Sequence, residues 1–340
     1  MKILILSHKF SPDIGGIESI SKMFAEEFVK AGHEVRIVTH SLDTENQKGS
    51  YLVFRQPKTK TLFKQFIWAD VVLENNPCMR LAWPLFFVRR PKVTGLQTWI
   101  TSADGSTGIT HHIKRYYLNF SSSVTACSYS LRQKTFYKAL VIGNPYQHEL
   151  FKIKKEIIRD KQFVFLGRLV SDKGADLAIK ALSIINNSNR TSYSLSIIGS
   201  GEEEIKLKKL VKILNLENIV TFFGSMQGEA LVNTLNRHEF LLVPSVWEEP
   251  FGIVALEGMA CGCLPIVSDG GGLPDAVGKA GMIFKRGDVD DMVKKMLKLL
   301  KDPLLTATLR NEMPKHLTLH TSEIVASKYL QLLKIAFERK

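Results

Sequence analysis

Two successive series of short apolar runs alternate with segments of helical periodicity, and this alternation constrains the fold more than any other feature. The first series opens with the apolar run 3–6, a loop, and a helix over 17–31 that ends at Gly32. Further strands are expected at 35–38, 71–73, 92–94, 124–126, 162–166, 194–198, 220–223, 240–243 and 264–267. Alternating strands and helices predict parallel, doubly wound sheets, and 340 residues suffice for two α/β domains.

The segment Val141–Pro145 closes the first series. We therefore predict an N-terminal Rossmann-like domain over 1–145 and a second Rossmann-like domain over 146–320. The remaining residues, 321–340, contain an amphipathic segment at 322–337 that predicts one more helix.

Charge and hydropathy limit the classes of protein. The net charge is +13, which favours an anionic partner. No nucleic-acid-binding signature is present. Many lysines fall at a helical spacing that is typical of a solvated face. No apolar run approaches the roughly 20 residues of a membrane span, and the N-terminal run is too short for a signal peptide. The four cysteines (Cys78, Cys127, Cys261, Cys263) lack zinc spacing. We expect a cytoplasmic protein with free thiols.

The segment from Ser245 to Glu257 carries two carboxylates, Glu249 and Glu257, between an apolar strand and a predicted helix. Ligands bind at the carboxyl ends of strands in open α/β sheets, where a carboxylate can accept hydrogen bonds from sugar or ribose hydroxyls. The alternative for either residue alone is a solvated loop glutamate or a helix cap.

Two cations follow another strand, Arg168 in Leu-Gly-Arg and Lys173 in Ser-Asp-Lys-Gly. An arginine fork and a lysine point charge suit a diphosphate, although a surface Arg and Lys taken alone carry no meaning. Glycines precede two predicted helices, at Gly15–Gly16 and at Gly270–Gly272, where backbone N–H groups can approach a phosphate. The spacing is not that of the dinucleotide fingerprint, which counts against an oxidoreductase.

Together, these motifs resemble those of the retaining GT-B glycosyltransferases of glycosyltransferase family four. There the paired glutamates stand in Glu-Gly-Phe-Gly, four residues, Glu-Ala-Met-Ala-Cys-Gly; this chain has Pro250 and Gly258 at two of those positions, and Asp275 where Glu is usual. The resemblance covers most of the second domain and the start of the first, while 41–92 matches nothing specifically.

The resemblance implies two domains facing each other across a cleft, with the last helix packing back on the first domain. It implies Arg168, Lys173 and Glu249 as catalytic residues that stabilise the departing nucleoside diphosphate and hold the sugar. The donor-binding set that it implies is Gly15, Gly16, Arg168, Lys173, Glu249, Phe251, Gly252, Ile253, Glu257 and Gly271. The donor would be a UDP- or GDP-sugar.

One position departs from the family. Gln97 stands where many relatives place a histidine beside the reacting sugar, so we assign it to the acceptor side as a hydrogen-bonding residue that cannot act as a base. This fits a mechanism in which a donor phosphate oxygen takes the acceptor proton. His111 and His112, further along, are expected in a loop. No Asp-x-Asp motif is found, so we predict a metal-independent enzyme without a cofactor.

The predicted function is therefore transfer of a sugar to a glycan or lipid-linked acceptor in cell-envelope polysaccharide or glycolipid synthesis. A GT-B epimerase or phosphorylase, and a basic adaptor that binds nucleic acid, remain as alternatives. Aromatic and basic residues alternate over 58–68 and 79–92, among them Phe66, Phe86, Phe87 and Lys92. These residues predict peripheral contact with an anionic membrane. The alternative is that the aromatic residues belong to the core of the first domain and the basic residues form its solvated edge.

Overall fold

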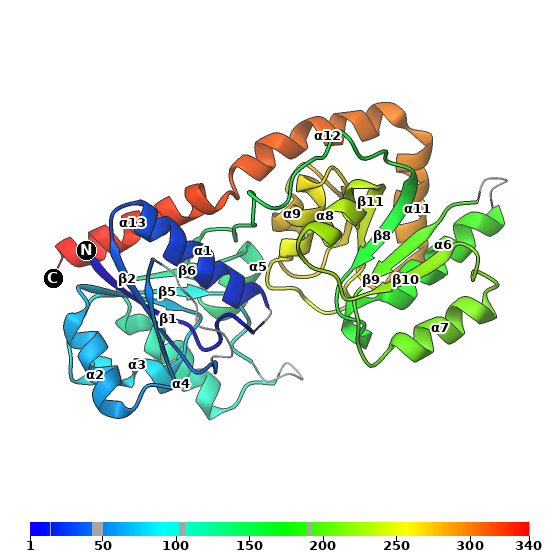
Figure 1. Cartoon of the computed structure of the whole chain (residues 1–340). Helices are drawn as coiled ribbons and strands as arrows, with labels where there is room; N and C mark the ends of the chain where they lie inside the picture. Colours follow the sequence, from blue (N-terminus) through cyan, green and yellow to red (C-terminus); the bar gives the residue numbers. More distant parts are fainter. Residues whose placement is uncertain (14, 43–49, 102–105, 189–191, 340) are drawn as a thin grey trace. The chain divides into compact units, whose positions relative to one another are not determined.

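The computed structural model describes residues 1–13, 15–42, 50–101, 106–188 and 192–339. These residues form two compact units, one made of Met1–Pro145 with Thr321–Lys340 and the other of Tyr146–His320. Each unit contains one parallel sheet with helices packed on it (Figure 1). Within the described ranges, no helix combines the length and the apolar character that a membrane crossing requires.

The first sheet has the strand order β3-β2-β1-β4-β5-β6-β7, and all its pairs are parallel. Its central strands carry the apolar runs 3–6 and 71–73, which suit a sheet covered on both faces. The strands are β1 (Lys2–Leu6), β2 (Glu34–Thr39), β3 (Leu52–Arg55), β4 (Val71–Asn75), β5 (Lys92–Leu96), β6 (Ser123–Ala126) and β7 (Leu140–Val141). Strands β2 and β3 lie on one side of β1, and β4 to β7 lie on the other. The topological switch point of this sheet therefore falls between β1 and β4.

The helices of this unit are α1 (Gly16–Lys30), α2 (Thr59–Trp68), α3 (Met79–Ala82), η1 (Trp83–Phe86), α4 (Ile109–Tyr117), η2 (Leu118–Phe120), α5 (Tyr129–Thr135) and α13 (Ser322–Glu338). Helix α13 lies along α1 and covers β4 and β5 (Figure 1). Its Tyr329 is fully buried, with its ring 4.5 Å from that of Phe24. His111 and His112 lie in α4, so their expected place in a loop is wrong; the His111 Nδ1 accepts from the Gly108 N–H at 2.9 Å and caps the helix.

The second sheet repeats the same plan with the order β10-β9-β8-β11-β12-β13, again all parallel. The strands are β8 (Lys161–Leu166), β9 (Leu195–Ile198), β10 (Val220–Gly224), β11 (His238–Val243), β12 (Leu264–Ser268) and β13 (Met282–Phe284). The switch in direction falls between β8 and β11. The predicted α/β class with doubly wound parallel sheets is confirmed.

The helices of the second unit are η3 (Ser171–Lys173), α6 (Ala175–Ser188), α7 (Glu204–Ile213), α8 (Gly228–Asn236), α9 (Ile253–Ala260), α10 (Leu273–Val277), α11 (Val289–Lys301) and α12 (Pro303–Thr318). Helix α11 shows why they form: Asp288 caps its first turn, and Met292, Met296 and Leu299 are buried at helical spacing. Its Lys294 and Lys298 are exposed, as a solvated basic face predicts.

Candidate active site

The loops after β8 and β11 hold most of the predicted site residues. These two strands pair side by side, yet the chain leaves them toward opposite halves of the sheet. In doubly wound sheets this switch point opens a crevice at the carboxyl ends of the strands, and ligands bind there. Arg168 and Lys173 follow β8, and Glu249 follows β11.

Glu249 and Lys173 are in direct contact. The Lys173 Nζ donates to Glu249 Oε1 at 2.5 Å, and the Ser245 hydroxyl donates to the same oxygen at 2.8 Å. The ammonium also lies 5.1 Å from the centre of the Trp247 ring. Both charged side chains are largely buried, so the pair holds each partner in one position.

Backbone hydrogen bonds join the two loops that carry this pair. The Val246 and Trp247 N–H groups donate to the Asp172 carbonyl at 2.9 and 3.2 Å. Gly174 has φ +70°, and a Cβ there would lie 2.0 Å from the Pro244 carbonyl oxygen. Only glycine therefore permits this approach of the two chains.

A third loop supports Glu249 through its backbone. Gly271 forms a parallel bridge with Glu249, and the Gly272 N–H donates to the Glu249 carbonyl at 2.7 Å. Gly271 has φ +67°, and its Cβ would lie 2.1 Å from that carbonyl oxygen. The predicted glycine loop thus lies against the predicted catalytic glutamate.

Helix α9 begins directly after this loop. Gly252 is its N-cap with φ +110°, and Ile253 is its first residue. The Phe251 side chain is 2% exposed and packs on the His320 ring, so this residue can meet a ligand mainly through its backbone. Its side chain belongs to the core of the unit.

Glu257 lies in the second turn of α9, which excludes the alternative that it caps the helix. Its carboxylate makes no hydrogen bond or ion pair with the rest of the described chain. Burial raises the pKa of Glu257 to about 7. The side chain is partly exposed, so a ligand hydroxyl could supply the missing partner.

Arg168 is exposed and likewise forms no hydrogen bond or ion pair within the described residues. Its loop is held by a neighbour that the sequence reasoning missed, the Gly199–Gly201 turn after β9. The Leu169 N–H donates to the Ser200 carbonyl at 2.9 Å, and a Cβ on Gly199 would lie 1.8 Å from the Gly167 carbonyl oxygen. The signal was available, since Gly-Ser-Gly follows a predicted strand directly.

The remaining predicted residues lie in the first unit. Gly15 precedes α1, Gly16 is its first residue, and a Cβ on Gly15 would lie 2.3 Å from the Glu18 carboxylate. Gln97 follows β5; its N–H donates to Asn76 Oδ1 at 3.2 Å. Its side chain is 5% exposed and lies next to the Tyr329 hydroxyl of α13. A role of Gln97 toward an acceptor stays a prediction.

The two doubly wound parallel sheets are those of a GT-B protein, and solved structures share this fold. HepE from Anabaena, in complex with UDP, matches with a TM-score of 0.84 at 19% identity, covering 98% of this chain and 100% of that one. Residues 129–316, more than half of the chain, match the family described as glycosyl transferases group 1. The chain belongs to this family, which is glycosyltransferase family four, and the protein is a glycosyltransferase.

Curated relatives also span most of the chain. N-acetyl-alpha-D-glucosaminyl L-malate synthase from Bacillus anthracis is 25% identical over 343 residues, covering 86% of this chain and 86% of the relative. The gpi3 subunit of phosphatidylinositol N-acetylglucosaminyltransferase from Schizosaccharomyces pombe is 23% identical over 337 residues, covering 88% and 73%.

Proposed function

We propose that this protein is a retaining glycosyltransferase that moves a sugar from a UDP- or GDP-sugar to a glycan or lipid-linked acceptor. The observation that carries the proposal is the meeting of Lys173, Glu249 and the Gly271 loop at the switch point of the second sheet. Arg168 on the adjoining loop has no hydrogen bond or ion pair among the described residues. HepE was solved with UDP, and a mannosyltransferase of Corynebacterium glutamicum that matches this chain is named as GDP-mannose-dependent.

The chemistry follows from the charges at these loops. When the bond between the anomeric carbon and the diphosphate breaks, negative charge grows on the departing nucleoside diphosphate. The exposed Arg168 guanidinium can donate two parallel hydrogen bonds to its oxygens, and Lys173 adds a second positive charge. Glu249, already held by Lys173 and Ser245, accepts hydrogen bonds from sugar hydroxyls. The acceptor oxygen forms its bond to the anomeric carbon on the face from which the diphosphate departs, which retains the configuration, and an oxygen of the departing phosphate takes the acceptor proton.

Glu257 fits the ribose of the donor. Two vicinal hydroxyls can donate to its carboxylate, which has no partner among the described residues. Because burial raises its pKa to about 7, hydrogen bonds from the ribose would stabilise the ionised form. The other donor-side contacts in this proposal are backbone groups of Phe251, Gly252 and Ile253 at the start of α9.

The test is nucleotide release with each donor, measured by chromatography in the presence of EDTA. We expect turnover to continue in EDTA, because two cations do the electrostatic work of a metal ion. Glu249→Ala should abolish turnover while circular dichroism shows a folded protein. Wild-type rates in that variant would overturn the assignment, and a nucleotide-sugar epimerised without acceptor would favour an epimerase.

We further propose that the acceptor is carried by a lipid and that the first unit docks on the inner face of the membrane. The matched relatives include enzymes whose names contain phosphatidylinositol acceptors. Phe86 and Phe87, after α3, are 67% and 73% exposed beside the basic residues Arg89 and Arg90. Phe66 and Lys92, which the sequence placed in the same membrane-facing mixture, are instead buried, and Lys92 pairs with Glu74 at 3.3 Å.

A cavity of about 560 Å³ is lined in part by Phe86. Its lining residues include the apolar Leu85, Phe86 and Phe120 and the basic Arg89, Arg90 and Arg339. It lies at the start of β5, whereas Gln97 follows the other end of that strand. Such a cavity suits docking to an anionic lipid headgroup rather than the transfer reaction itself.

Sedimentation with liposomes of anionic or neutral lipid tests the docking. Phe87→Ala combined with Arg89→Ala should reduce binding to anionic liposomes several-fold. The matched control is Phe223→Ala with Lys208→Ala, which removes an exposed aromatic and an exposed cation from the second unit. Equal loss in both double variants, or equal binding to both lipids, would favour a soluble acceptor.

A further inference from the structure

Three side chains of types that commonly bind metal ions lie together at the carboxyl edge of the first sheet. His8 follows β1, His40 follows β2, and Cys78 lies between β4 and α3. Strands β2, β1 and β4 are neighbours in the sheet, so the loops that follow them lie together. Residues separated by 32 and 38 positions in sequence are thereby brought into one cluster.

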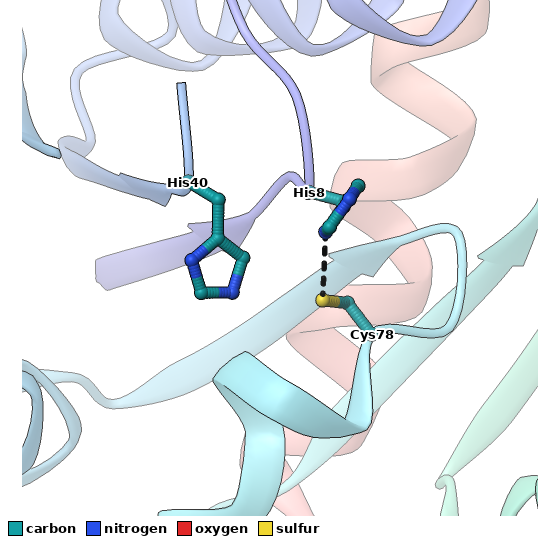
Figure 2. A group of neighbouring side chains, drawn as sticks. All are labelled: His8, His40 and Cys78. Carbon is teal, nitrogen blue, oxygen red and sulfur yellow. Dashed lines mark hydrogen bonds between the residues drawn. The ribbon is translucent and has the colours of Figure 1, made fainter. Parts of the chain in front are cut away.

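The geometry of this cluster suits a small metal ion. One ligand atom of each residue lies within 4.8 Å of the other two. The His8 Nδ1 and the Cys78 Sγ are 3.6 Å apart, and Figure 2 shows the His40 ring beside them. Tetrahedral zinc, with bonds of about 2.1 Å to nitrogen and about 2.3 Å to sulfur, places these two ligand atoms about 3.6 Å apart.

His40 provides a second, independent observation. Its Nε2 is buried and has no hydrogen-bond partner within the described ranges. A buried ring nitrogen without a partner costs free energy, which coordination to a metal would offset. His8 is exposed, so its side chain can move toward the other two ligands without disturbing the core.

We propose that His8, His40 and Cys78 bind a zinc ion in the first unit. Two imidazoles and a thiolate are ligands that zinc prefers, and three protein ligands leave the fourth position open to water or another small ligand. The site lies apart from the loops after β8 and β11, whereas His8 shares the loop after β1 with Gly15 of the proposed donor-binding set. Binding would tie together the loops after β1, β2 and β4.

The surroundings limit the affinity. The positive charges of Arg80, Lys9 and Lys114 act on His8 and oppose a bound zinc ion. Ionisation of the Cys78 thiol on binding supplies a compensating negative charge. Hard cations such as Mg²⁺, which prefer oxygen ligands, should not bind here.

Competition against a chromogenic chelator measures zinc binding by the full-length, untagged protein after removal of metals. We expect one zinc ion per chain, and a rise in melting temperature with Zn²⁺ but not with Mg²⁺. Co²⁺ should produce a thiolate-to-cobalt charge-transfer band. Cys78→Ser should remove that band, and Cys78→Ser or His40→Ala should weaken zinc binding by more than the roughly 10- to 100-fold of an outer-shell change.

Matched controls are Cys127→Ser, another buried thiol of this unit, and His112→Ala, an exposed histidine on α4; both should bind zinc like the wild type. Wild-type protein that takes up no zinc would overturn the proposal, whether or not the variants fold. Unchanged binding in folded Cys78→Ser would overturn it equally. Loss of binding in the control variants as well as in the ligand variants would also count against these three ligands.

Discussion

Arg168 and Lys173 carry the same charge but differ in their hydrogen-bond partners. Substitutions at the two positions should therefore distinguish an effect on turnover from an effect on stability. Lys173 bonds to Glu249, whereas the exposed Arg168 bonds to none of the described residues. We predict that Arg168→Ala lowers turnover by about 10²- to 10³-fold without changing the melting temperature. Lys173→Ala should lower both, because it leaves the largely buried Glu249 carboxylate without its ion-pair partner.

Paired measurements of turnover and thermal unfolding on both variants test this prediction. A drop in melting temperature for Arg168→Ala would show that its side chain has a structural partner. Unchanged stability of Lys173→Ala would show that the ion pair contributes little.

Glu257 predicts a pH dependence of stability. Its folded pKa is about 7, above the ordinary value of 4.5, so the folded state holds its proton more tightly than the unfolded state. The stabilisation is complete below about pH 4.5 and is lost as pH rises through 7. Glu257→Gln should therefore be more stable than the wild type at pH 8 by on the order of 1–3 kcal/mol, and the two should converge near pH 5.

Urea unfolding of the wild type and Glu257→Gln at pH 5 and pH 8 checks the sign. A stability difference that does not change with pH would contradict the raised pKa.

Among the elements, the loop after β8 and the end of β10 each contain a glycine with the same backbone conformation. Gly174 and Gly224 share φ +70°, but a Cβ on Gly174 would lie 2.0 Å from the Pro244 carbonyl oxygen, and one on Gly224 would meet no atom within 4 Å. Gly224→Ala should cost only the backbone strain of about 1–2 kcal/mol. Gly174→Ala should destabilise more and also reduce turnover, because it separates the loops that hold Lys173 and Glu249.

Denaturant unfolding and steady-state rates measure both effects. Equal losses of stability and activity in the two alanine variants would show that the close approach at Pro244 is not important.

The elements also show what sequence can predict. Strands β8 and β11 contain the continuous apolar runs 163–166 and 240–243, so their place in a covered parallel sheet follows from composition. Edge strand β3 was not predicted, although 52–54 is a short apolar run; among the described strands it pairs with β2 alone, and none of its residues is buried. Helix α12 was missed because its apolar stripe is weak and Pro314 interrupts its sequence.

The same limit holds for the candidate site. Arg168, Lys173 and Glu249 lie in sequence motifs that could be recognised. The hydrogen bond between Lys173 and Glu249 could not be predicted, because it joins residues 76 positions apart. Such a contact depends on the order of strands. No sequence spacing predicts the cluster of His8, His40 and Cys78, because the loops after three neighbouring strands bring these residues together.

At the scale of the whole molecule, the two units differ in how the chain builds them. The second unit is one continuous stretch, Tyr146–His320, whereas the first needs α13 from the far end of the sequence. We predict that a fragment of residues 146–320 folds alone and is stabilised by UDP or GDP in a thermal-shift assay. A fragment of residues 1–145 should fold poorly, because Phe24 and the faces of β4 and β5 lose their cover.

Adding a peptide of residues 321–340 to the 1–145 fragment should restore cooperative unfolding, followed by circular dichroism. Full stability of the 1–145 fragment without the peptide would contradict this prediction.

The place of α13 also sets an order of events on the ribosome. Translation proceeds at roughly 5–20 residues per second, so the stretch between residues 145 and 321 delays the arrival of α13 by about 10–35 seconds. During that time the nascent first unit carries an uncovered apolar face, while the second unit can already complete its own core. The half of the enzyme that is synthesised first is thus the half that finishes folding last.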